Sequence, residues 1–307
     1  MSPPHQDGIG KTKAGSNVNR RDFILSSAAA IAGSSLPSFA RADVPKPYDW
    51  DAVPPLDSRS DFIEWMKANR GEDAKFLGQR FDRYRWMVSI RDLFTERDKR
   101  AFLMTPREEF CRPPNLPRVY SIDFLDIGFG VTISGPGLVG RMTSSIDVQR
   151  GDKVLEVGTG SGYQSAVLSN LTDKVWSIEI IEPLFDRTRK TYDALIDRGY
   201  NEYKAITTKH ADGYYGWEEN GPFDKIIVTC GIDHIPPPLL QQLKPNGLMV
   251  IPIGPPGAQH VLKVVKHVAD DGTITVTRND IYNGHVIPFV PFTALVGDQI
   301  KGTHNGK

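Results

Sequence analysis

The chain has 307 residues, of which 39% are hydrophobic and 24% are charged, and its 37 basic side chains balance its 37 acidic ones. This composition is typical of a globular protein and excludes wholesale disorder, collagen and coiled coil. The balanced charge argues against sequence-independent binding to nucleic acid, which needs an excess of Lys and Arg. The two cysteines, Cys111 and Cys230, cannot form a disulfide framework or a structural zinc site, and the seven histidines lack metal-ligand spacing. We therefore expect no metal.

Residues 1–42 resemble a twin-arginine export signal. The pair Arg20-Arg21 precedes a mild apolar run at 28–32, and the segment ends in small residues at 40–42. The apolar run is too short, and too diluted by serine and proline, for a membrane span. The pattern predicts a periplasmic protein, and a cytoplasmic protein with a plain solvated tail is the alternative.

A linker and helices are predicted for residues 43–104. Four prolines between 43 and 57 favour an extended linker. Ser58 or Ser60 can cap a first helix, apolar residues at three- and four-residue spacing predict a second helix at about 73–94, and Thr95 with Asp98 predicts a capped third helix ending near Met104. We interpret the apolar stripes of these helices as faces packed into the core.

Strand and helix patterns alternate from residue 152 onward. The predicted strands are 153–157, 175–178, 204–208, 225–229 and 248–253, and the predicted helices are 163–170, 183–198 and 236–243. A turn is expected at 244–247, and Asp271-Gly272 predicts a hairpin of 261–268 with 273–277. These elements predict a doubly wound, Rossmann-like α/β sheet with an antiparallel edge hairpin, attached to an N-terminal helical appendage.

A glycine-rich loop follows the first predicted strand of the sheet. Its residues are Gly158, Thr159, Gly160, Ser161 and Gly162. Such a loop lets a ligand approach the backbone closely. Tyr163 breaks the GxGxxG pattern, which disfavours a dinucleotide. Glu156 should repel a diphosphate and attract a cationic ligand, and S-adenosylmethionine fits because it carries an ammonium and a sulfonium but no phosphate.

Two further acidic positions follow the next strands. Glu179 ends the second strand, where a carboxylate can accept hydrogen bonds from both ribose hydroxyls. Asp212-Gly213 follows the third strand and is expected to receive the adenine amino group. Each acid alone could be a solvated loop residue. Three acids at the ends of consecutive strands indicate a binding site, because open α/β sheets bind ligands there.

Four segments outside the glycine loop carry a family signature. They are Pro106-Arg107-Glu108-Glu109-Phe110, Thr132-Ile133-Ser134-Gly135-Pro136, Leu243-Lys244-Pro245-Asn246-Gly247 and Phe289-Val290-Pro291-Phe292. With them, the sequence resembles the protein-L-isoaspartate O-methyltransferases over roughly residues 88–297. The glycine loop is common to many methyltransferases, whereas the Thr-Ile-Ser-x-Pro and Phe-Val-Pro segments are far more specific.

The resemblance implies a methyltransferase domain at 105–297, followed by a disordered tail at 298–307, and a monomeric protein. It implies methyl transfer from S-adenosylmethionine to the free carboxylate of L-isoaspartyl residues in damaged proteins and peptides, with repair through a succinimide. By the same resemblance, Ser134 and Thr132 form the catalytic segment, and Phe289, Val290 and Pro291 bind the substrate backbone. No general base is needed, because a carboxylate is already ionised at neutral pH.

The acceptor side departs from the family pattern at Val131, Gly137 and Leu138. These departures leave two alternatives open. The protein could methylate the carboxylate of a different peptide or small acid. It could also bind isoaspartyl peptide or cofactor without catalysing a reaction.

Overall fold

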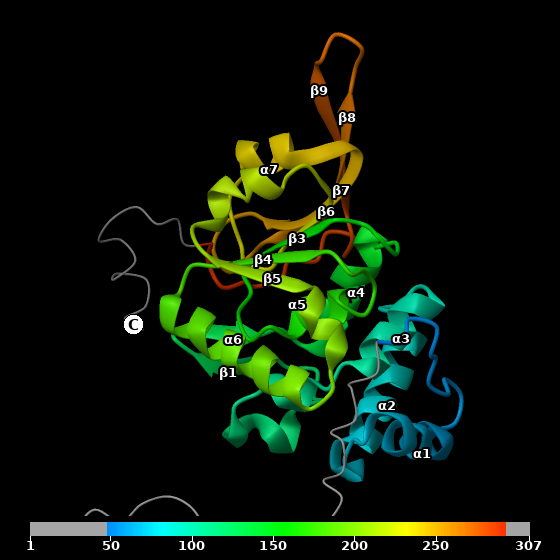
Figure 1. The fold of residues 1–307 in the computed structure, drawn as a ribbon. Coiled ribbons are helices and arrows are strands. Elements are labelled where there is room, and N and C mark those ends of the chain that lie inside the picture. The colour runs from blue at the N-terminus through cyan, green and yellow to red at the C-terminus, as the bar shows by residue number, and fades with distance from the viewer. Residues whose placement is uncertain (1–47, 293–307) are drawn as a thin grey trace, which may run out of the picture. The chain divides into compact units, whose positions relative to one another are not determined.

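The computed structural model describes residues 48–292. The expected export signal at 1–42 and the expected tail at 298–307 therefore lie outside the described residues. A seven-stranded sheet dominates the described part, in the order β5-β4-β3-β6-β7-β8-β9 (Figure 1). The strands are β3 (Val154–Val157), β4 (Val175–Glu179), β5 (Ile206–His210), β6 (Phe223–Val228), β7 (Leu243–Ile253), β8 (His260–Val268) and β9 (Ile274–Asp280).

The first five strands of this sheet are parallel, and β8 and β9 are antiparallel. This arrangement confirms the predicted doubly wound α/β fold with an antiparallel edge hairpin. Because β4 and β6 flank β3 on opposite sides, the chain reverses direction across the sheet at β3. A crevice opens at the carboxyl end of the strands at such a reversal, and this is where sheets of this class bind ligands.

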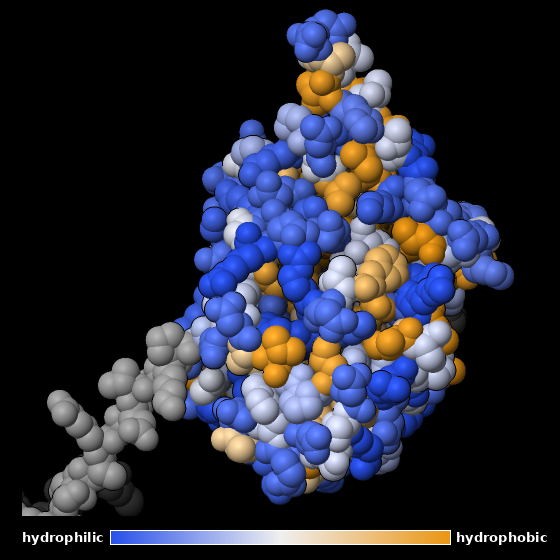
Figure 2. Space-filling view, turned by 90° about the vertical axis from the view of Figure 1, so that its right-hand side faces the viewer, coloured by the Kyte–Doolittle hydropathy of each residue, from blue (hydrophilic) through white to orange (hydrophobic). Residues whose placement is uncertain are grey.

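Helices cover both faces of the sheet. Along β3, Val154 belongs to the apolar cluster on one face and Leu155 to the cluster on the other, as expected for a strand buried on both sides. The first face packs against α4 (Pro136–Ile146), α5 (Tyr163–Leu168) and α6 (Glu182–Asp197), and the second against α7 (Pro237–Gln242). The molecular face in Figure 2 is largely hydrophilic, with apolar side chains gathered in patches below the β8–β9 hairpin.

Three N-terminal helices build a separate apolar cluster. They are α1 (Arg59–Arg70), α2 (Ala74–Ser89) and α3 (Glu96–Met104). Ser58 caps α1, and Thr95 forms a reciprocal capping box with Asp98 at the start of α3, as the sequence predicted. The second helix ends at Ser89, five residues earlier than predicted, because Arg91 adopts a left-handed conformation with φ of 59°.

Buried ion pairs join these helices to the rest of the described chain. Arg80 is fully buried, and its Nη2 atom lies 2.7 Å from a Glu72 oxygen and 2.8 Å from Glu108 in η1 (Arg107–Phe110). Arg70 Nη2 lies 2.6 Å from Glu202 in η3 (Asn201–Ala205). The helical appendage is therefore tied to the sheet domain by paired charges as well as by apolar packing.

Two predicted segments differ in the structure. The strand expected at 204–208 begins at Ile206, because the residues before it form η3. The turn expected at 244–247 lies inside β7, where the register with β6 jumps from Phe223↔Leu243 to Lys225↔Leu248. The extra residues form a bulge, and Asn246 takes its left-handed position with φ of 61°.

The predicted linker is irregular over its described part, 48–57, but it is anchored to the domain. Arg100 of α3 donates hydrogen bonds to the Ala52 carbonyl at 2.7 Å, the Asp49 carbonyl at 2.9 Å and the Tyr48 hydroxyl at 2.8 Å. The same guanidinium donates to the carbonyl of Asn170 after α5. This segment is therefore held in place and is not a free linker.

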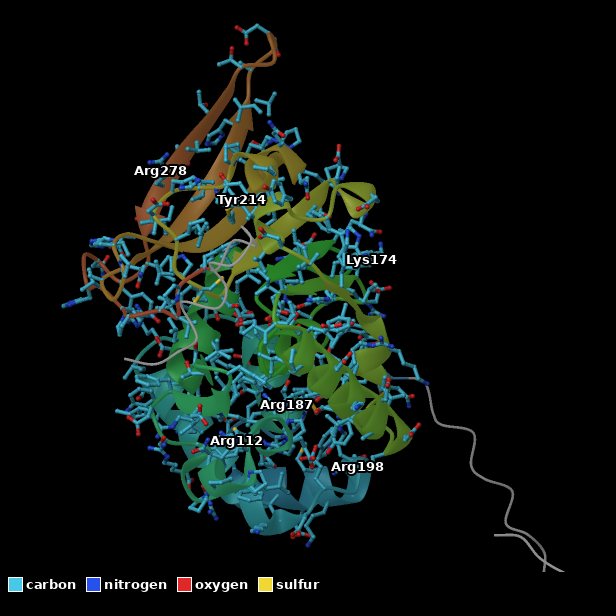
Figure 3. The ribbon with its side chains drawn as sticks, turned by 90° about the vertical axis from the view of Figure 1, so that its left-hand side faces the viewer. Arg112, Lys174, Arg187, Arg198, Tyr214 and Arg278 are labelled. Atoms are coloured by element: carbon cyan, nitrogen blue, oxygen red, sulfur yellow. The ribbon has the colours of Figure 1, made fainter. Side chains whose placement is uncertain are left out.

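The segment between α3 and β3 contains elements that the sequence patterns did not predict. They are η2 (Pro113–Arg118), the hairpin of β1 (Leu125–Gly128) with β2 (Val131–Ile133), and α4. Arg187 of α6 donates to the Ile127 carbonyl at 2.6 Å, and Arg112 pairs with Asp126. Figure 3 shows these two arginines close together, and their contacts hold the hairpin against the domain.

Two short helical turns, η4 (Gly213–Tyr215) and η5 (Glu218–Asn220), separate β5 from β6. Across residues 48–292, we find no helix with the length and hydropathy that crossing a membrane requires.

Candidate functional site

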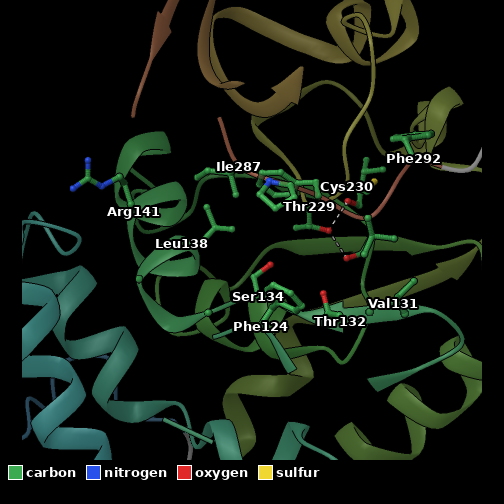
Figure 4. Close-up of a pocket in the computed structure, with 18 of the residues that line it drawn as sticks. Phe124, Val131, Thr132, Ser134, Leu138, Arg141, Thr229, Cys230, Ile287 and Phe292 are labelled. Carbon is green, nitrogen blue, oxygen red and sulfur yellow. Dashed lines mark hydrogen bonds between the residues drawn. The ribbon is translucent and has the colours of Figure 1, made fainter. Parts of the chain in front are cut away.

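A cavity of about 820 Å³ opens at the carboxyl ends of β3, β4 and β6 (Figure 4). Its volume is in the range of small-molecule binding sites. Its walls come from the glycine loop, the β1–β2 hairpin, the first turns of α4 and the segment 282–292. Of the residues predicted for the site, the ones that line this cavity are Thr132, Ser134, Gly158, Gly160, Glu179, Gly213, Phe289, Val290 and Pro291.

The glycine loop is shaped by left-handed glycines. Gly158, Gly160 and Gly162 have φ of 99°, 56° and 91°, values that favour glycine over residues with a side chain. A Cβ atom on Gly158 would collide with the hydroxyl of Thr229, which donates to the carbonyl of Gly158 at 2.7 Å. Thr229 follows β6 and was not predicted as a site residue, yet it fixes the loop that forms the cavity floor.

The remaining loop residues lie beside or beneath the cavity. Ser161 and Thr159 line a smaller adjoining cavity of about 60 Å³. The Thr159 hydroxyl lies 2.6 Å from that of Ser177 and is buried. A Cβ atom on Gly162 would lie 2.5 Å from the hydroxyl of Tyr192, so this glycine permits close packing of α6 against the loop.

Glu179 lies in the cavity wall and is held by backbone donors. One carboxylate oxygen accepts from the amides of Ile180 at 3.0 Å and Ile181 at 2.9 Å, and the other accepts from Gly160 at 2.7 Å. Burial raises the pKa of this carboxyl group, and the three amide donors oppose that shift. Each oxygen keeps lone-pair capacity. Each oxygen can therefore accept a further hydrogen bond, and the role of Glu179 toward ribose hydroxyls stays a prediction.

Glu156 does not line the cavity, in contrast to the sequence-based expectation. It is fully buried beneath the glycine loop, where one carboxyl oxygen accepts hydrogen bonds from Ser165 and Ser177. Burial raises its pKa to about 8, so the group is largely protonated at neutral pH. The expected anionic wall is therefore absent at this position. Strand alternation explains the difference, because the Glu156 side chain points from β3 toward α5 and not toward the strand end.

Asp212 and Gly213 have different positions relative to the cavity in the structure. Gly213 lines the cavity and packs so tightly on Val157 that a Cβ atom would collide with it. The Asp212 carboxylate accepts from the amide of Tyr214 at 2.9 Å and caps η4. Asp212 thus shapes the turn that places Gly213, and it does not itself line the cavity.

The two predicted catalytic hydroxyls lie close to the glycine loop, because Thr132 and Ser134 line the smaller adjoining cavity together with Gly158, Thr159 and Gly160. Figure 4 shows Ser134 and Thr132 directed toward the space beneath Ile287 and Thr229. Within residues 48–292 no hydrogen bond occupies the Ser134 hydroxyl, so it can donate to an incoming acceptor. The next residue must be small, because a Cβ atom on Gly135 would collide with the Ile122 carbonyl.

The predicted substrate segment lines the cavity and is joined to the loop after β6 by an isolated β-bridge between Gly231 and Pro291. The Val290 carbonyl accepts from the amide of Gly231 at 2.8 Å, and the Phe292 amide donates to the Gly231 carbonyl at 2.6 Å. The Phe289 amide donates to the side chain of Gln259 at 3.0 Å. These bonds fix the segment against the loop after β6, so its lining side chains are preorganised.

Several cavity residues were missed by sequence reasoning. Arg141 of α4 donates to Asp92 at 2.6 Å and lies 4.9 Å from the ring centroid of Tyr282. Trp86 lies near the end of α2 and Ile90 directly follows this helix, in a segment whose apolar spacing we interpreted as core packing. No pattern in the sequence distinguishes these residues from core positions, because only the tertiary arrangement brings the end of α2 to the cavity.

Cys230 also lines the cavity, yet it lacks the features of a nucleophile. Burial strongly raises the pKa of its thiol, and the nearby carboxylates of Glu179 and Asp212 act in the same direction. The thiol is therefore protonated at neutral pH. In the part of the chain that the structure describes, no group of three or more His, Cys, Asp or Glu side chains could hold a metal ion.

Comparison with known proteins agrees with this geometry. The family described as Protein-L-isoaspartate(D-aspartate) O-methyltransferase matches residues 90–295. A protein-L-isoaspartate O-methyltransferase from Cupriavidus necator is 44% identical over 192 residues, covering 62% of this chain and 68% of that protein. One from Shewanella sediminis is 39% identical over 231 residues, covering 75% of this chain and 88% of that protein.

Solved structures of similar proteins share the fold. A protein-L-isoaspartate O-methyltransferase aligns over 73% of this chain and 68% of its own, with a TM-score of 0.58 and 25% identity. A protein from Plasmodium falciparum, described as a putative protein-L-isoaspartate O-methyltransferase and solved with S-adenosyl-L-homocysteine, aligns over 69% of this chain and 97% of its own, with a TM-score of 0.56 and 22% identity. Fold, cavity and sequence together show that this chain belongs to the protein-L-isoaspartate(D-aspartate) O-methyltransferase family.

Proposed function

We propose that this protein transfers a methyl group from S-adenosylmethionine to the free carboxylate of L-isoaspartyl residues in damaged proteins and peptides. The observation that carries the proposal is that one cavity joins the glycine loop and Glu179 to the hydroxyls of Thr132 and Ser134. A cofactor-binding surface and an acceptor-binding surface therefore face the same space. Family membership supports the same reaction.

The cavity fits the cofactor in size and in chemistry. The bare backbone at Gly158 and Gly160 allows close approach, Glu179 offers acceptors for ribose hydroxyls, and Gly213 lines the same cavity. S-adenosylmethionine supplies an electrophilic methyl group on a positively charged sulfur. The chain's own residues then have to orient two reactants and exclude water.

The acceptor side needs positioning more than acid–base chemistry. An isoaspartyl carboxylate is ionised at neutral pH, so no residue has to remove a proton from it. The Ser134 hydroxyl can donate a hydrogen bond to one carboxylate oxygen and leave the other oxygen directed toward the methyl group. The methyl ester then leaves the site, and closure to the succinimide and hydrolysis require no residue of this chain.

A paired-peptide assay tests this function. We expect methylation of an L-isoaspartyl peptide and no product from its L-aspartyl twin. Methylation of a different carboxylate, with the isoaspartyl peptide untouched, would support a different acceptor. Peptide binding without any methyl ester would instead indicate a binding module.

We also propose that the protein is exported to the periplasm through residues 1–42. The support is the order of the arginine pair, the mild apolar run and the small residues near Ala42. Changing Arg20 and Arg21 together to lysine should retain the protein in the cytoplasm in fractionated cells. Unchanged processing and location would contradict the proposal and favour a protein that acts in the cytoplasm.

A monomer is the oligomeric state that we propose. The described cavity is built from elements of a single chain, so the site needs no second copy. Light scattering of the full chain should give a mass near 34.1 kDa. A mass near twice that value would contradict the proposal.

A further inference from the structure

The mouth of the cavity carries exposed apolar side chains. Trp86 is 40% exposed, Ile90 39%, Ile122 62% and Phe124 63%, and all four line the cavity. We call these four residues the apolar rim. Large apolar side chains gathered at the entrance to a site are costly to leave in water, and such patches commonly mark a surface that binds a partner.

The rim depends on the end of α2. Trp86 lies before the family match, which starts at residue 90. Gly137 admits this helix end to the start of α4, because a Cβ atom there would lie 2.6 Å from an Asp92 oxygen and 3.5 Å from the Trp86 ring. Gly137, where the chain departs from the family pattern, therefore leaves the space in which Trp86 of α2 packs.

The ring of Trp86 is held in place. The guanidinium of Arg83 lies 4.7 Å from the ring centroid, and its Nε atom donates to the Tyr120 carbonyl at 2.6 Å. A fixed aromatic surface loses little conformational freedom when a ligand packs against it. Trp86 thus has the properties of a binding surface.

The charges near the rim are of both signs, so the rim is distinguished by its apolar side chains. The Arg141 guanidinium is already paired with Asp92 at 2.6 Å. Asp123 lies in sequence between Ile122 and Phe124, is exposed and also lines the cavity. A substrate side chain at the mouth therefore meets apolar surface flanked by charges of both signs, since the Arg83 guanidinium lies against Trp86.

We propose that the apolar rim binds a large apolar side chain next to the isoaspartyl residue, and that this contact determines substrate preference. The inference rests on the proposed function. An isoaspartyl residue is part of a chain, so its neighbours must lie at the mouth when its carboxylate reaches Ser134. The preferred substrates are then damaged segments whose apolar residues have become exposed.

Matched L-isoaspartyl peptides test the proposal. The neighbouring residue is Leu, Ser or Glu, placed in one series before the isoaspartyl residue and in a second series after it. In at least one series we expect kcat/KM to be about tenfold higher for Leu than for Ser, the size expected from partial burial of one apolar side chain, and lowest for Glu. Trp86→Ala should bring the ratio of Leu to Ser close to one, mainly through KM.

Phe94→Ala is the matched control, because Phe94 is 53% exposed, lies in the chain segment just after α2 and does not line the cavity. It should keep the ratio of the wild type. Phe124→Ser provides a second rim variant if Trp86→Ala proves unstable in thermal unfolding. Equal kcat/KM for all peptides in the wild type, or an unchanged ratio in both rim variants, would overturn the rim proposal. Failure to methylate any isoaspartyl peptide would instead overturn the proposed function.

Discussion

At the scale of single residues, two polar groups near the cavity have opposite surroundings. Glu156 is enclosed beneath the glycine loop with a pKa raised to about 8. Ser134 faces the cavity, where a substrate carboxylate can reach its hydroxyl. We therefore expect the first residue to affect how folding stability responds to pH, and the second to affect catalysis.

Glu156 should make the protein less stable as pH rises. In the unfolded chain its carboxyl group ionises near its ordinary pKa of 4.5, whereas in the folded protein it stays protonated up to about 8. Its stabilising contribution is therefore complete below pH 4.5 and is lost progressively up to about pH 8, at about 1.4 kcal/mol per pH unit.

Glu156→Gln removes this ionisation while keeping the shape of the side chain. Measured without cofactor, the melting temperature of the variant should gain on that of the wild type between pH 5 and pH 8. The exposed Glu64→Gln serves as a control and should follow the wild type. Parallel curves for wild type and Glu156→Gln would show that Glu156 is ionised in the folded protein.

Ser134→Ala should lower kcat/KM for an isoaspartyl peptide by about 10- to 100-fold, the value of one hydrogen bond to a charged group. Its affinity for S-adenosyl-L-homocysteine, measured by calorimetry, should stay within about twofold of the wild type, because the glycine loop and Glu179 are untouched. Full turnover by the variant would remove Ser134 from the mechanism.

At the scale of elements, the glycine loop is the part most tightly determined by local geometry. Gly158 combines a φ of 99° with a close approach to Thr229 after β6. A side chain at Gly158 would therefore be disfavoured both by backbone strain and by steric overlap with Thr229. The loop consequently has one conformation that suits both the sheet and a ligand.

Gly158→Ala should therefore displace the loop and weaken binding of S-adenosyl-L-homocysteine by more than tenfold in calorimetry, with a loss of about 1–3 kcal/mol in unfolding free energy. Gly199→Ala is a useful comparison. Gly199 also has positive φ, at 100°, but a Cβ atom there meets nothing within 4 Å. The Gly199→Ala variant should lose stability while keeping its affinity for S-adenosyl-L-homocysteine. Equal loss of affinity in both variants would contradict a specific role for the loop.

The elements also show which features a sequence can predict. The strands β3, β4 and β6 are buried on both faces. Their apolar runs, and the turns that end them, can therefore be predicted from the local sequence. The hairpin of β1 and β2 has strands of four and three residues, too short for any periodicity. The burial of Glu156 and the position of Trp86 at the cavity depend on packing between distant segments, and no local sequence pattern predicts such packing.

At the scale of the whole described chain, buried charges connect the N-terminal helices to the domain that contains the site. Arg80 pairs with Glu72 and Glu108, and the hydroxyl of Tyr120 lies 2.9 Å from its Nε atom. Since α2 supplies Trp86 to the cavity mouth and is followed directly by Ile90, this network fixes part of the proposed substrate surface.

Arg80→Ala should reduce the free energy of unfolding by about 3–5 kcal/mol, because it removes the fully buried guanidinium that pairs with the largely buried carboxylates of Glu72 and Glu108. Urea denaturation measures the loss. Arg59→Ala, which breaks an exposed ion pair with Asp82, should cost at most about 1 kcal/mol. Similar losses for both variants would mean that the buried network contributes no more than a surface pair.

The outermost strand of the sheet has a consequence for a protein that handles damaged chains. Strand β9 ends the sheet and pairs with β8 along one side, and most of its side chains, such as Thr275 and Arg278, are exposed. A long apolar border would invite misfolded clients to add their own strands and aggregate. The end of β9 at Arg278 carries charged and polar side chains and is therefore a poor template for strand addition by a partly unfolded polypeptide, whereas Ile274 at its other end is 41% exposed.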